Sequence, residues 1–377
     1  MKGEKLKGEK VEGKRLMSLD ALRGFDMLFI MGLAGLVTAV CGALGCGDGI
    51  LATQMRHVEW HGLVHHDTIF PLFLFIAGVA FPFSYASQVA KGRSRAQICL
   101  RVFKRAALLV LLGAICNGLL RDGVRDLRLA SVLGRIGLAW AGAALLYVFC
   151  GVRARVAAAV AILVGYGCLL ALVPAPDAAA GADPFSMDGC IVAWVDRHFL
   201  PGTLYYETFD PEGILSTVPA VVTAMLGVFC GELIRSARPS LAGGRKDAAM
   251  AAAAAALAVL AAVFAPVCPI NKQLWTPTFV LACGAYSVAM LALFHWIVDV
   301  KGWRRWTFPL RVVGMNAITI YVLQGIVDFT RASKFFLGFL SKAVPDAWGP
   351  VVLAAGYLLC CWLVLWFLYR KNVFLKV

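Results

Sequence analysis

About ten runs of roughly twenty mostly apolar residues follow one another along this sequence, and a helix needs a run of that length to cross a bilayer. Hydrophobic residues make up 60% of the 377 residues and charged residues only 15%, which excludes an ordinary soluble domain. We therefore predict an all-α polytopic membrane protein, a bundle of about ten transmembrane helices. The predicted spans are residues 24–45, 68–89, 103–120, 131–150, 153–174, 214–235, 248–265, 276–298, 308–330 and 349–369.

Lys and Arg are concentrated in alternate connections between these runs, so the sequence also predicts an orientation. Cytoplasmic loops of membrane proteins carry an excess of Lys and Arg. The basic segments are residues 1–15, 91–105, 235–246 and 301–305, together with the end of the chain. Both termini are therefore expected in the cytoplasm. We expect residues 1–15 to form a basic tail and residues 16–377 to form one membrane domain.

The excess of Lys and Arg also indicates what kind of partner the protein has. The net charge of +14 is mostly explained by topology, and it calls for no nucleic-acid partner. The partner that it indicates is the lipid bilayer.

The stretch "RHVEWHGLVHHD", residues 56–67, places four histidines just before the second span and on the side opposite the termini. Three uses of such a cluster are open from the residues alone. His57, His61 and His65 share a four-residue spacing that could ligate a metal, but Gly62 interrupts a helix there, so we expect no metal site. A proton relay or pH sensor is the second use, and acyl-transfer chemistry at a single histidine is the third.

Further polar groups lie near both faces of the predicted bundle. "YETFDPEGILSTVPA" (206–220) and "NKQLWTPTFVL" (271–281) open spans on the histidine side. "SLDALRGFD" (18–26) lies on the cytoplasmic side, where Asp20, Arg23 and Asp26 at three-residue spacing predict an ion-paired ladder. Arg135 in "LGRIG" lies inside a span, where an arginine is costly and usually has a partner or ligand.

The order of these motifs carries a resemblance over essentially the whole chain. "SLDALRGFDM", "HVEWHGLVHHDTIFPLFLFIAGV", "LGRIG", "DPEGILSTVPA" and "NKQLWTPTFVL" together resemble the heparan-α-glucosaminide N-acetyltransferase family, including its bacterial relatives of the DUF5009 type. The resemblance implies that residues 16–377 form a transmembrane acyltransferase domain in a bacterial inner membrane. It implies transfer of acetyl from cytosolic acetyl-CoA to the amine of a glucosamine-type sugar on the far side.

The resemblance also implies roles for individual residues. The family's catalytic histidine precedes a W-x-G motif, and here that position is His57, before Trp60 and Gly62. It gives His61, His65 and His66 no role. Asp67 is the candidate that orients His57, although a carboxylate there could also simply cap the second span.

The remaining candidate residues are assigned either to the sugar that accepts the acetyl group or to acetyl-CoA, which donates it. Trp60, Asp210, Glu212, Asn271 and Lys272 are candidates for binding the amino-sugar or oligosaccharide acceptor. Lys272 could stabilise an oxyanion or simply anchor its loop. Arg23, Arg105 and Arg135 are candidates for the phosphates of acetyl-CoA.

Two other functions remain open at this stage. A secondary transporter of amino sugars or peptides would also have about ten spans, although the sequence has no convincing internal repeat. An O-acyltransferase that modifies envelope polysaccharide would share the general layout. The sequence leaves open the identity of the acceptor, direct transfer as against an acetyl-histidine intermediate, and whether the protein is a homodimer.

Overall fold

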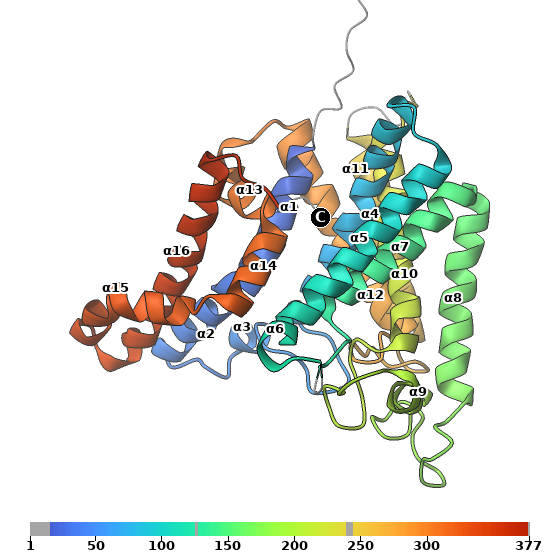
Figure 1. Cartoon of the computed structure of the whole chain (residues 1–377), viewed down its shortest axis with the longest axis horizontal. Coiled ribbons are helices and arrows are strands. Elements are labelled where there is room, and N and C mark those ends of the chain that lie inside the picture. Colours follow the sequence, from blue (N-terminus) through green and yellow to red (C-terminus); the bar gives the residue numbers. More distant parts are fainter. Residues whose placement is uncertain (1–15, 125–126, 239–243, 376–377) are drawn as a thin grey trace, which may run out of the picture.

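The computed structural model describes residues 16–124, 127–238 and 244–375, and this part of the chain is a bundle of helices (Figure 1). Three isolated β-bridges occur in the described ranges, and no strand does. The predicted all-α membrane fold is therefore confirmed. The basic tail predicted for residues 1–15 lies outside the described residues.

Eight helical segments of the described chain are long and apolar enough to cross a membrane, and one bent pair would make a ninth. The eight are Met17–Ala43, which joins α1 (Met17–Leu28) to α2 (Ala34–Ala43), α4 (His65–Ala90), α7 (Val132–Phe149), α8 (Val152–Leu172), α10 (Ile214–Arg235), α11 (Arg245–Phe264), Pro277–Val300, which begins with α12 (Pro277–Phe294), and Asp346–Arg370, which contains α16 (Gly349–Arg370). Nine of the ten predicted spans correspond to these segments.

The remaining predicted span, residues 103–120, has no counterpart among the apolar segments. Residues 103–116 of this span belong to α5 (Arg95–Cys116), a full-length helix that packs against α7. Every eighteen-residue stretch of α5 includes Arg101, Lys104 and Arg105, so the helix is too charged to count as a span by composition. The charges of α5 therefore need polar surroundings.

The predicted span 308–330 is also not a single helix. It is broken into α13 (Phe308–Gly314) and α14 (Ala317–Ile326), and the two segments of this pair are bent by 54°. α15 (Phe329–Ala343) then follows before α16. The described chain also contains three short α-helices that the sequence did not predict, namely α3 (Ile50–Thr53), α6 (Leu119–Asp122) and α9 (Ile191–Phe199).

Glycines let the central helices approach closely. A Cβ atom on Gly227 of α10 would lie 2.0 Å from the Phe75 carbonyl oxygen of α4, and one on Gly78 would lie 2.0 Å from the Ala224 carbonyl oxygen. Small residues permit such close backbone packing in membranes, where dispersion contacts hold helices together. The α4–α10 contact therefore forms a tightly packed centre for the bundle.

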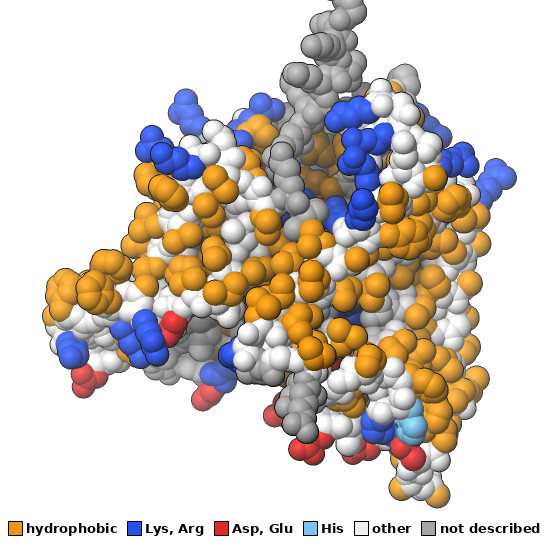
Figure 2. All heavy atoms as spheres, in the orientation of Figure 1, with side chains coloured by type: hydrophobic (Ala, Val, Ile, Leu, Met, Phe, Trp, Pro, Cys, Tyr) orange, Lys and Arg blue, Asp and Glu red, His pale blue; other side chains and the backbone are white. Residues whose placement is uncertain are grey.

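The two ends of the bundle differ in charge. α4 begins at the end that carries residues 44–64, the 173–213 stretch and the 265–276 loop; we call this the histidine end. At the opposite end, here called the basic end, lie the connection after α4, the start of α1 and the end of α16 (Figure 1). Figure 2 shows Lys and Arg side chains, without Asp or Glu, at the basic end, and Asp and Glu side chains together with some Lys and Arg at the other end.

Candidate active site

His57 and Asp67 form the centre of a polar cluster at the histidine end. His57 Nδ1 lies 2.6 Å from Asp67 Oδ1, and Asp67 is completely buried in the first turn of α4. The second carboxylate oxygen of Asp67 accepts weaker bonds from the backbone amides of Val58 and Val64, at 3.5 and 3.4 Å. Asp67 thus caps α4 and orients His57 at the same time. These contacts fit both alternatives that the sequence left for Asp67, and its role toward a catalytic His57 stays a prediction.

Lys272 completes this cluster from the loop before α12. Its Nζ lies 3.2 Å from Asp67 Oδ1 and 3.0 Å from His57 Nδ1. The His57 side chain is 51% exposed, whereas the Lys272 side chain is 19% exposed. The buried Asp67 carboxylate therefore contacts both the Nδ1 atom of His57 and the ammonium group of Lys272. The rest of the His57 imidazole remains accessible from the histidine end.

The loop that carries His57 is fixed to the loop that carries Lys272. The Gly62 amide donates to the Ile270 carbonyl at 2.8 Å, and Gly62 has a φ of 123°, which side chains rarely allow. The Asn271 side chain, which is fully buried, lies 3.3 Å from His61 Nδ1 and accepts from the Leu274 amide at 2.8 Å. Asn271 and His61 thus join the two loops.

Trp60 has a similar anchoring contact. Its indole N–H donates to the Phe185 carbonyl at 2.8 Å, and its ring meets the Phe209 ring edge-on with centroids 5.5 Å apart. The tryptophan predicted for acceptor binding thereby ties residues 56–67 to the 173–213 stretch.

Asp210 and Glu212, also predicted for the acceptor, share one arginine. Arg128 donates to Asp210 from Nε at 2.8 Å and from Nη2 at 2.7 Å, and Nη2 also donates to Glu212. Burial alone would lower the pKa of Arg128, but its bonds to these two carboxylates raise that pKa above its ordinary value. Arg128 was not among the predicted site residues. The sequence signal that could have found it is the group of three arginines between residues 121 and 128, on the side of the bundle where the other loops carry few cations.

Arg135, predicted for acetyl-CoA, lies near the histidine end. It is 2% exposed, donates to Ser216 in the first turn of α10, and places its guanidinium 5.0 Å from the Trp275 ring centre. Arg135 Nε has no hydrogen-bond partner among the described residues. The structure does not bring Arg135 together with the other two predicted arginines.

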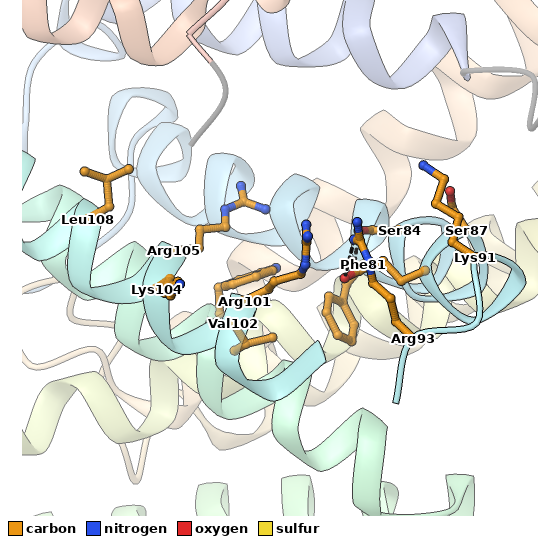
Figure 3. Close-up of a pocket in the computed structure, with 12 residues that line it drawn as sticks. Phe81, Ser84, Ser87, Lys91, Arg93, Arg101, Val102, Lys104, Arg105 and Leu108 are labelled. Carbon is orange, nitrogen blue, oxygen red and sulfur yellow. Dashed lines mark hydrogen bonds between the residues drawn. The ribbon is translucent and has the colours of Figure 1, made fainter. Parts of the chain in front are cut away.

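Arg105, by contrast, lines a cavity of about 500 Å³ between α4 and α5 (Figure 3). The cations that line this cavity are Lys91, Arg93, Arg101, Lys104 and Arg105, and the described residues around it include no Asp or Glu. Arg105 stacks over Trp140 at 4.3 Å, and its Nε lacks a hydrogen-bond partner among the described residues. Arg23 of α1 bonds to Asp20 at 3.3 Å and lies within electrostatic range of Arg105.

This cavity fits a ligand with several negative charges. Arginine and lysine bind phosphate oxygens through charge-assisted hydrogen bonds, and coenzyme A carries several phosphates. Figure 3 shows Arg101 and Arg105 pointing to the same side of α5. In the described part of the chain no group of three metal-ligating side chains is found.

The described part of the chain has eight helical segments that are long and apolar enough to cross a membrane, or nine with the bent pair, and this defines a multi-pass membrane protein. No protein-family model matches the chain. The chain is distantly related to heparan-alpha-glucosaminide N-acetyltransferase. It is 25% identical to the mouse protein over 377 residues, covering 85% of this chain and 56% of that protein. It is 25% identical to the human protein over 422 residues, covering 96% of this chain and 60% of that protein. The chain thus spans less than two thirds of these relatives.

Proposed function

We propose that this protein is a membrane N-acetyltransferase that moves acetyl from cytosolic acetyl-CoA to the amine of a glucosamine-type sugar on the opposite side. The observation that carries the proposal is the His57–Asp67–Lys272 cluster at one end of a bundle whose other half holds a cavity lined by cations. The distant relationship to a named N-acetyltransferase supports the same reaction.

His57 supplies the base in this proposal. A protonated amine is not a nucleophile, so a neutral imidazole must remove its proton as the thioester is attacked. Asp67 holds Nδ1, which leaves Nε2 to face the acceptor. The same imidazole could instead accept the acetyl group first and pass it on. In this proposal Lys272, whose Nζ lies 3.0 Å from His57 Nδ1, stabilises the negative charge that develops on the carbonyl oxygen.

The basic cavity is our proposed site for the phosphates of acetyl-CoA. Arg101, Arg105 and Lys104 would hold them, and Arg23 lies close enough to contribute from α1. Arg135 is less suited to this role because it is already bound to Ser216 and Trp275.

The proposal requires a defined topology, with the basic end and both termini in the cytoplasm of a bacterium. Lysine and arginine gather at that end, as expected for cytoplasmic loops. In a background without native cysteines, a cysteine at position 56 should react with an impermeant reagent added to intact cells. A cysteine at position 93 should not react. The reverse pattern would contradict transfer across the membrane.

The activity itself is tested by incubating purified protein with labelled acetyl-CoA and a panel of amino sugars and muropeptide-like acceptors. We expect label in a base-stable amide, and transfer by His57→Ala reduced by at least about 10²-fold. A base-labile ester would identify an O-acyltransferase instead. Absence of any acetylated product across the panel, with acetyl-CoA still bound, would count against the proposal.

A further inference from the structure

Two cysteines lie where the first membrane-spanning segment ends, at the histidine end of the bundle (Figure 1). The Cys46 amide, just beyond α2, donates to the Cys41 carbonyl at 2.8 Å. The Gly45 amide donates to the Gly42 carbonyl at 3.1 Å, and Gly45 has a φ of 72°, a conformation that glycine adopts readily. These two hydrogen bonds around a left-handed glycine define a Schellman motif, a common ending of α-helices.

This motif brings the side chains of Cys41 and Cys46 together. The residue after the left-handed glycine commonly contacts the residue five positions earlier, and Cys46 and Cys41 occupy these two positions. Their thiols lie close enough to interact electrostatically and through a side-chain hydrogen bond. Standard backbone dimensions and the 2.8 Å bond keep the two Cα atoms within about 6.7 Å, and disulfides span about 4.4 to 6.8 Å. The turn is therefore compatible with a disulfide.

The two thiols differ in access, as a dithiol that is oxidised by exchange requires. Cys46 is exposed, whereas Cys41 is 3% exposed. An oxidant therefore reaches Cys46 first, and Cys41 lies beside it to complete the bond. Cys190, which also lies near the histidine end, is buried, and its thiol donates to the Met187 carbonyl at 3.5 Å.

The turn that follows Cys46 supports the loop that carries His57. The Gly49 amide donates to the Cys46 carbonyl at 2.9 Å. The Arg56 guanidinium donates to the Gly47 carbonyl at 3.1 Å, and Arg56 directly precedes His57 in the chain. A covalent bond at Cys46 therefore fastens one support of the His57 loop to the end of α2.

We propose that Cys41 and Cys46 form a disulfide in the cell, with the histidine end facing an oxidising compartment. The inference rests on the proposed topology and not on the proposed acetyl transfer. Disulfides persist in extracytoplasmic compartments and are rare in the cytoplasm.

The oxidant is a disulfide of an extracytoplasmic thiol oxidase. The Cys46 thiolate attacks that disulfide, and the Cys41 thiolate then displaces the oxidase from the mixed disulfide. Two S–H bonds break and one S–S bond forms in this protein. The two electrons and two protons that the cysteines lose convert the disulfide of the oxidase to a dithiol.

The test uses the full-length protein in bacterial cells, which are quenched in acid before free thiols are blocked with N-ethylmaleimide in denaturant. Trypsin releases residues 24–56 as one peptide, in which Cys41 and Cys46 are the only cysteines. We expect this peptide to be unlabelled and lighter by two hydrogens than its reduced form. Reduction before blocking should add two labels. Cys99, in the tryptic peptide 96–101 of α5, should be labelled in every sample and is the control for complete blocking.

Cys41→Ser and Cys46→Ser should each leave the remaining cysteine of this peptide fully labelled. A reductant should lower the melting temperature of purified wild-type protein and leave that of Cys46→Ser unchanged, because a cross-link restricts the unfolded chain. An equal response of the two proteins would contradict the fastening role.

Two labels on the wild-type peptide without prior reduction would overturn the proposal. Incubation of the purified protein with oxidised glutathione then identifies the cause. A disulfide that forms only with glutathione would place the histidine end on the reducing side and would contradict the proposed topology. No disulfide with glutathione would show that the two thiols do not meet. Absence of acetyl transfer by a protein that carries the disulfide would contradict the proposed function alone.

Discussion

His57 and Asp67 are ten residues apart in the chain, and the Nδ1 atom of one lies 2.6 Å from the Oδ1 atom of the other. The Asp67 carboxylate is buried and the His57 imidazole is half exposed. Asp67 can therefore hold the imidazole in position while the rest of the ring stays accessible. Lys272 arrives from a loop 205 residues beyond Asp67 and contacts the same oxygen. This three-residue cluster makes the site testable by single substitutions.

His57→Ala should reduce acetyl transfer by about 10² to 10⁴, or roughly 3 to 5 kcal/mol, because the base is lost. Binding of acetyl-CoA should persist, since the basic cavity is formed by other helices. Transfer and binding should be measured side by side, with His198→Ala in α9 as the control. Wild-type turnover in His57→Ala would rule out the mechanism.

Lys272→Met should lower turnover by about 10² to 10³, the cost typical of losing an oxyanion-stabilising donor. His57 would still contact Asp67, so the loss should appear in kcat more than in acetyl-CoA affinity. Lys342→Met at the end of α15 removes a lysine far from the cluster and serves as the comparison. If both lysine variants turn over at the same rate, Lys272 only anchors its loop.

Arg101→Ala and Arg105→Ala should each weaken acetyl-CoA binding about tenfold or more, because a charge-assisted hydrogen bond contributes about 1.5 to 3 kcal/mol. The affinity of wild-type protein should also fall as salt rises. Calorimetry in detergent measures both effects. Arg331→Ala, at an exposed arginine of α15, should change neither. Unchanged affinity in the double variant would place the donor site elsewhere.

Gly227→Ala should destabilise the bundle by about 1 to 3 kcal/mol, because its Cβ would collide with the Phe75 carbonyl and force α4 and α10 apart. Gly165→Ala in α8 has nothing within 4 Å of the new Cβ and should be neutral or slightly stabilising. Thermal unfolding of the two variants in the same detergent compares them directly. Equal melting temperatures would show that α4 and α10 are not in close contact.

Asp196 of α9 should make stability fall as pH rises. Burial raises its pKa to about 7, although its Oδ1 accepts a bond from the Ile214 amide at 2.9 Å. The folded state therefore holds a proton that the unfolded state releases near pH 4, and stability is lost as pH rises through about 7. Asp196→Asn should flatten this dependence and melt higher than wild type at pH 8. Parallel pH profiles for the two proteins would refute the assignment.

The sequence by itself determined the class of fold, and it supplied the prediction that the site lies at residues 56–67. Runs of apolar residues of this length specify helices because a helix satisfies its own backbone hydrogen bonds inside a bilayer. Among the described residues, eight predicted spans match single apolar helical segments and a ninth matches a bent pair. The resemblance of residues 56–67 to a known family singled out His57, with Asp67 as its candidate partner. One loop and the start of α4 bring the two residues into contact.

The tertiary structure decided the contacts between residues far apart in the chain. Lys272 forms an ion pair with Asp67. Arg128 forms ion pairs with both Asp210 and Glu212. Arg105 lines the basic cavity, whereas Arg135 is not among the residues that line it. A sequence pattern gives the residues of a helix and their spacing, but contacts between helices depend on rotation, crossing angle and depth. Those are set by packing, such as the close approach at Gly227, and a charged side chain's partner is known only once the helices are in place.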